Sequence, residues 1–208
     1  MLDAVRISSN ELFAVLTAIS FAAGLNVYAT VATLGLLAHT GMFPLPPDLQ
    51  LLSSWYVIAS CGILFLVELF ADKIPVFDLL WNALHTFVRI PVAALLAYGA
   101  TAELSSGCQL FATLLGGAIA LAAHGGKTAV RAAVTPYPEP FSNITLSLGE
   151  DALAVFLTWF ATRHPYWAAM ISLAFVLVVV VLMRWVVLAL CSMLRRARKE
   201  LELIFSGI

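Results

Sequence analysis

The chain has 208 residues, of which 62% are hydrophobic and 11% are charged, and its formal net charge is -1. A soluble domain carries about 25% charged residues, so this composition excludes an ordinary water-soluble fold. The near balance of 11 basic and 12 acidic side chains gives no electrostatic basis for nucleic-acid binding.

Apolar segments, read against charges and prolines, predict an all-α fold, a polytopic transmembrane helix bundle of about six spans. We expect these spans near 12–38, 51–70, 76–102, 108–124, 143–162 and 166–193. The prediction is a single integral membrane domain over residues 1–208, with half-repeats at 1–104 and 105–208.

The first span contains a candidate break at Gly24 and Asn26. A discontinuous helix at this point would expose backbone groups to a substrate, with Asn26 as a pathway residue. Close packing of a neighbouring helix explains the glycine equally well. Both explanations of Gly24 stand at this stage.

The second span ends in an acidic pair, and a basic group follows the fourth span. The acidic pair is Glu68 and Asp72, and Lys73 follows it. The basic group is His124, Lys127 and Arg131, which lie around an expected glycine break at 125–126. Two like charges four residues apart repel each other, so we expect the two groups to meet in a salt-bridge network rather than form a cation-binding mouth. Such a network can also act as a gate.

Pro91 divides the third span, which is the weakest of the set. Ahead of it, Asp78, Asn82, His85 and Arg89 recur at helical spacing and therefore share one face. The opposite face is apolar, so the polar stripe is expected to face the bundle interior or an aqueous vestibule. The alternative is an amphipathic helix that lies on the membrane surface or re-enters it.

Glu150 and Asp151 lie about midway along the fifth span and are the strongest single signal. A charged side chain at a helix centre costs at least about 2.5–3.5 kcal/mol in hydrocarbon, so each needs a partner, a cavity or a function. Neighbouring helical residues point about 100° apart, so one can face a pore while the other seeks a cation such as Arg89 or Arg184. An ion or proton pathway and a buried ion pair remain the two alternatives.

The charges also predict a topology. The basic run at 195–199 follows the last span and is typical of a cytoplasmic end. With both termini in the cytoplasm, Arg163 is the one basic residue in an outer loop, as the positive-inside rule expects.

The two halves of the chain show a faint repeat. LFAVL at 12–16 resembles LFATL at 110–114, and each run leads to glycine, a proline-rich loop and an acidic pair. Three spans in each half would make the halves inverted, an arrangement that many secondary transporters use around a midplane site. Chance similarity between alanine- and leucine-rich helices is the alternative.

The sequence contains no Walker loop, no HExxH and no GxSxG motif, so it predicts no catalytic residue, no cofactor and no metal site. Cys61, Cys108 and Cys191 are scattered through apolar stretches and show no disulfide or metal spacing.

The polar motifs resemble those of a bacterial multi-pass membrane family, domain of unknown function 4126. The resemblance rests on the segments 24–30 (GLNVYAT), 72–75 (DKIP), 124–131 (HGGKTAVR), 138–143 (PEPFSN) and 150–151 (ED), together with Glu68, Asp78, Trp81, His85 and Arg89. It covers nearly the whole chain. It implies a bacterial cytoplasmic-membrane protein and leaves the substrate open.

The leading hypothesis is a transporter or channel for a small solute or ion, and the deep acidic residues favour a cation or a proton-coupled process. The expected pathway residues are Asn26, Asp78, Asn82, His85, Arg89, Glu150 and Asp151, and the gate or ion-pair network is Glu68, Asp72, Lys73, His124, Lys127 and Arg131. The expected partners are membrane lipids and the solute, and a homo-oligomer is allowed. The alternatives are a non-transporting scaffold or accessory subunit with paired charges, and a lipid-handling protein.

Overall fold

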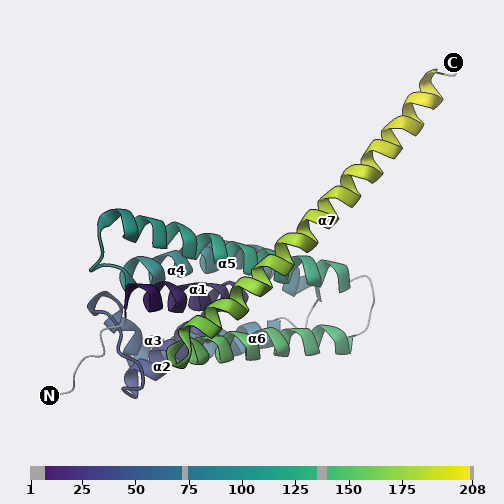
Figure 1. Ribbon diagram of the computed structural model, residues 1–208. Coiled ribbons are helices and arrows are strands. Elements are labelled where there is room, and N and C mark those ends of the chain that lie inside the picture. Colours follow the sequence, from purple (N-terminus) through teal and green to yellow (C-terminus); the bar gives the residue numbers. More distant parts are fainter. Residues whose placement is uncertain (1–7, 72–74, 135–139, 207–208) are drawn as a thin grey trace.

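The computed structural model describes residues 8–71, 75–134 and 140–206. Its elements are α1 (Ser9–Leu25), α2 (Val27–His39), the 3-10 helix η1 (Pro47–Ser53), α3 (Trp55–Ala71), α4 (Pro75–Ala100), α5 (Ser106–Val134), α6 (Pro140–Arg163) and α7 (Pro165–Ser206). Figure 1 shows a helical bundle from which the C-terminal half of α7 extends far beyond the other helices. The all-α prediction is confirmed.

Four helices are long and apolar enough to cross a membrane. The apolar stretches are Ala83–Ala100 in α4, Ser106–Val130 in α5, Ile144–Arg163 in α6 and Pro165–Trp185 in α7. η1 and α3 meet at 62° and make a fifth span if the bent pair crosses as one. The chain is therefore a multi-pass membrane protein with four or five candidate spans in its described part, and the prediction of about six spans is not confirmed.

Polarity in this bundle is the reverse of that in a soluble protein. Phe87 on α4 is 81% exposed and Leu114 on α5 is 65% exposed, whereas Glu68 and Arg89 are completely buried. Large apolar side chains on the outside are stable in lipid, and buried charges then have to be satisfied by each other. Leu84 is exposed beside Phe87, which confirms the apolar outer face expected for this part of α4.

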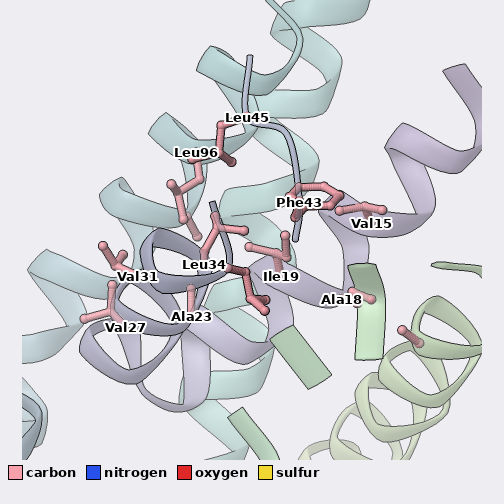
Figure 2. Packing of buried hydrophobic residues seen from close by; sticks show 14 of the residues in the cluster. Val15, Ala18, Ile19, Ala23, Val27, Val31, Leu34, Phe43, Leu45 and Leu96 are labelled. Carbon is pink, nitrogen blue, oxygen red and sulfur yellow. The ribbon is translucent and has the colours of Figure 1, made fainter. Parts of the chain in front are cut away.

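The segment expected as the first span is two helices. α1 has 17 residues and α2 has 13, and the chain turns at Asn26, whose backbone is extended at φ -148° and ψ 104°. Ile19 and Leu34 belong to one core cluster and lie close together in Figure 2, and Ser9 lines the same cavity as the loop after α2. α2 therefore runs back toward the end at which α1 begins.

α1 is the central helix. Its residues 14–25 are all buried, and it packs against α4, α5, α6 and α7. Small side chains permit this close packing, as in many membrane bundles. A Cβ on Gly24 would lie 2.5 Å from the carbonyl oxygen of Ala120 and 2.7 Å from the Cβ of Ala123, both on α5. Gly24 thus serves helix packing, while the break itself falls at Asn26.

Two other expected breaks are absent from the structure. α4 continues through Pro91, although proline removes a backbone donor, and the residues next to Pro91 pack against α5, as Ile90 and Ala93 do beside Gly117 and Gly116. α5 likewise continues through Gly125 and Gly126. A Cβ on Gly126 would lie 2.5 Å from Cγ2 of Val179, so this glycine makes room for α7 instead of ending a helix.

The structure does not confirm two inverted halves. The similar runs at 12–16 and 110–114 lie in α1 and α5, but α1 is followed by a break and a short returning helix, whereas α5 is a continuous helix of 29 residues. The division of the domain at residue 104 stays a prediction.

Candidate functional site

The break between α1 and α2 is made by the backbone and side chain of Asn26. Its N–H donates to the carbonyl of Ala22, which closes α1, and its Oδ1 accepts from the N–H of Ala29, which caps α2. One residue thus ends one helix and begins the next. The last carbonyls of α1 have no partner within the helix, and the helix dipole gives them partial negative charge.

Two cationic side chains from other helices reach these carbonyls. Lys127 Nζ on α5 donates to Leu25 O at 3.2 Å, and Arg89 Nη1 on α4 donates to Gly24 O at 3.5 Å. Positive charge at the C-terminal end of a helix is stabilising. The bundle therefore binds the exposed backbone at the break with buried cations.

These cations belong to a larger group, which we call the charged centre. It consists of Asn26, Glu68 on α3, Arg89 on α4, His124 and Lys127 on α5, and Glu150 and Asp151 on α6. Arg89 pairs with Glu68 Oε1, and Lys127 Nζ lies 3.6 Å from the same oxygen and 3.3 Å from Glu150 Oε2. The side chain of Glu150 is 11% exposed, and those of Glu68, Arg89 and Lys127 are completely buried.

Asp151 faces the break directly. Its Oδ1 accepts a hydrogen bond of 2.8 Å from Asn26 Nδ2. Ser147 and Thr158, which share a face of α6 with Asp151 at helical spacing, are buried too. Asp151 thus lies beside the first turn of α2, where the helix dipole is positive.

The hydrogen bonds of His124 fix its ring as neutral. Arg89 Nη1, which can only donate, lies 2.9 Å from His124 Nδ1. Nδ1 must then accept, which leaves the proton on Nε2, 2.7 Å from the hydroxyl oxygen of Thr86. His124 therefore links Arg89 to Thr86 without adding charge.

His85 lies on the same face of α4 as Arg89 and is buried. Its Nδ1 lies 2.7 Å from the carbonyl of Trp81, so Nδ1 carries a proton, and its Nε2 lies 3.1 Å from the hydroxyl of Tyr28 on α2. The neutral ring thus accepts from Tyr28. His85 connects α4 to the helix that follows the break.

The charged centre brings acidic and basic side chains together. Its carboxyl groups are those of Glu68, Glu150 and Asp151, and its cations among the described side chains are Arg89 and Lys127. Within the described residues, no group of three or more His, Cys, Asp or Glu side chains is placed to hold a metal ion.

Residues predicted in two separate sets meet in one place. The pathway residues Asn26, Arg89, Glu150 and Asp151 join the network residues Glu68, His124 and Lys127. Glu68 does meet Lys127, as expected. Glu150 is paired with Lys127, whereas Arg89 binds Glu68 and Arg184 is exposed on α7.

Five predicted site residues lie outside the described part of the chain. These are Asp72 and Lys73, and the side chains of Asp78, Asn82 and Arg131. Sequence reasoning missed Thr86 and Tyr28 as members of the site. Thr86 lies three residues before Arg89 and Tyr28 two residues after Asn26, so proximity to these residues was the available signal.

A comparison with curated proteins and a comparison with solved structures found no match. A protein-family model described as Domain of unknown function (DUF4126) matches residues 13–185, which include every member of the charged centre. The match extends over far more than half of the chain. This protein therefore belongs to the DUF4126 family.

Proposed function

We propose that this protein transports a small cation or a proton across the membrane and binds it in the charged centre. The observation that carries the proposal is the buried Glu68 Oε2, which has no hydrogen-bond partner among the described residues and lies in a nearly buried site with the carboxyl groups of Glu150 and Asp151. Charge held away from water is costly unless a partner balances it. A bound cation or an added proton supplies that balance.

Glu68 offers an oxygen for this role. Its Oε1 binds Arg89, whereas its Oε2 is buried and has no hydrogen-bond partner among the described residues. A buried acceptor without a partner costs about 1–3 kcal/mol. A cation bound at Glu68 Oε2 removes this cost.

The helix break supplies an element that can change its contacts. Lys127 joins Leu25 O at the end of α1 to Glu68 on α3 and Glu150 on α6. Broken helices present backbone carbonyls to coupling ions in several transporter folds. We assign Lys127 to the gate, because its release would free one carbonyl and two carboxylates for a cation.

Flux measurements test this function. We expect proteoliposomes with Asp151→Asn to show cation- or proton-driven flux reduced by at least about tenfold, because the variant removes the carboxylate that faces the helix break but keeps an acceptor for Asn26. Glu11→Gln is the matched control, since glutamine also serves in the capping box that Glu11 forms with Ser8 at the start of α1. Unchanged flux in Asp151→Asn would sink the proposal.

A non-transporting scaffold is the second candidate. The ion pairs that connect α3, α4, α5 and α6 favour it, since pairs of this kind can serve only to fix helix packing. In a scaffold, Asp151→Asn changes the unfolding temperature, and wild-type proteoliposomes show no flux for any cation in the panel.

The fold also bears on the topology of the transporter. The basic run at 195–199 supports a cytoplasmic C-terminus. α1 begins at one end of the bundle, and α2 returns to the same end. α3 to α7 then cross the bundle in alternating directions (Figure 1). We therefore propose that α1 begins on the side of the membrane opposite the C-terminus, which differs from the expectation of two cytoplasmic termini.

Terminal reporters test this topology. We expect alkaline phosphatase fused to the N-terminus behind an added linker to be active and green fluorescent protein fused to the C-terminus to fluoresce. Fluorescence from both fusions would instead show two cytoplasmic termini and a full first span.

A further inference from the structure

A cavity of about 550 Å³ lies at the end of the bundle where α1 begins. It is lined by α1, α2, α4, the start of η1, the loop residues 43–46 and the turn 102–104. Most of its lining is apolar, with Leu16, Leu34 and Leu96 from the three helices. The charged side chains in the described lining are two carboxylates, Asp48 and Glu103, and both are exposed.

A layer of small apolar side chains separates this cavity from the charged centre. We call it the apolar plug, and it consists of Ala23, Val27, Val31 and Ala93, each at most 6% exposed. All four belong to one core cluster with cavity-lining residues. In Figure 2, Ala23, Val27 and Val31 lie together on the side of Leu34 that faces away from Leu45 and Leu96.

The cavity and the charged centre share the same three helices. The lining extends to Ile19 on α1, Leu34 on α2 and Leu96 on α4. The charged centre begins at the break after α1 and at Arg89 on α4. The distance between them is about two helical turns along each helix, or roughly 10 Å. The plug is thus the barrier between the two.

We propose that the cavity is a water-filled vestibule that concentrates small cations on one side of the membrane, and that the apolar plug closes it from the charged centre. The inference rests on the proposed function, for which it supplies the entry route and the sign of the charge. Carboxylates beside low-dielectric walls focus a negative potential that attracts cations and repels anions. A dry apolar constriction blocks ions until it is wetted.

Charge-selective thiol labelling tests the vestibule in the full-length protein in membranes. The background carries Cys61→Ala, Cys108→Ala and Cys191→Ala, and Ala100→Cys then places one thiol in the cavity lining. Two methanethiosulfonates of similar size, one a trimethylammonium and one a sulfonate, serve as probes. We expect the cationic probe to react about tenfold faster than the anionic probe, after correction for their intrinsic rates.

Matched variants separate charge selection from general access. Asp48→Asn combined with Glu103→Gln is expected to bring the two corrected rates close to equality at Ala100→Cys. At Tyr166→Cys, an exposed position outside the cavity, the two probes are expected to react at similar rates in both backgrounds. Ala93→Cys, in the plug, is expected to react at least about tenfold more slowly than Ala100→Cys with either probe.

Three outcomes overturn the inference. Equal corrected rates at Ala100→Cys show a cavity without charge selection, as for a site that holds a lipid chain. Reaction at Tyr166→Cys but not at Ala100→Cys shows a cavity closed to water. Labelling of Ala93→Cys as fast as Ala100→Cys removes the plug. Labelling does not require transport. If the thiols react at the expected rates but the protein shows no flux, the proposed function is contradicted and the vestibule is not.

Discussion

Replacing Arg89 with methionine is expected to lower the free energy of unfolding by about 3–5 kcal/mol. Arg89 is completely buried, and it binds Glu68, His124 and the carbonyl of Gly24. Its loss removes the cation that binds Glu68 Oε1 and leaves Lys127 Nζ, 3.6 Å away, as the remaining cation described beside this buried carboxylate. Thermal unfolding in detergent, followed by circular dichroism or intrinsic fluorescence, measures the effect.

Two further variants show whether the ion pair causes the loss. In Glu68→Gln combined with Arg89→Met, both charges of the pair are absent, so the double variant should be more stable than Arg89→Met alone. Arg184→Met removes a basic residue from an exposed position on α7 and should unfold near the wild-type temperature. An Arg89→Met protein as stable as wild type would contradict the arrangement described for the charged centre.

Gly24→Ala is expected to destabilise the protein by about 2–3 kcal/mol through overpacking. The added Cβ would lie 2.5 Å from the backbone oxygen of Ala120, and a backbone atom cannot rotate away from the contact. α1 and α5 must separate instead. Since Lys127 on α5 binds Leu25 at the end of α1, the same shift lengthens the contact that holds the break.

Gly125→Ala is the matched control for this substitution. Gly125 lies within α5, and a Cβ built on it meets no other atom within 4 Å. Alanine is favoured over glycine in a helix by about 1 kcal/mol, so this variant should be as stable as wild type or more stable. Equal unfolding temperatures for Gly24→Ala and Gly125→Ala would show that α1 and α5 are not as close as described.

The sequence identified the buried polar residues better than their partners. Helical spacing placed His85 and Arg89 on one face of their helix, and the structure buries both. Spacing shows which residues share a face but not which helix that face meets. The pairing of Glu150 with Lys127, and of Arg89 with Glu68, depends on how α3 to α6 pack together.

Local signals for helix breaks gave mixed results for a related reason. At Asn26 the side chain caps α2 with its own oxygen, so the break is encoded locally. Pro91, Gly125 and Gly126 carry equally strong local signals, yet their helices continue. Packing against neighbouring helices offsets the local cost at these positions, as Gly126 shows by making room for Val179.

Composition by itself determined that the chain is a helical membrane protein, because a chain with so few charges and so many apolar residues is stable only with lipid around its helices. It also determined which polar residues are costly enough to require an explanation. The tertiary structure decided that α1 and α2 fold back and that four helices bring their charges to the break between them. It also decided that a cavity with two carboxylates in its lining lies at the end of the bundle where α1 begins, next to the buried residues of the apolar plug. These features join residues far apart in the chain, and their free energy comes from contacts between helices, which no local pattern contains.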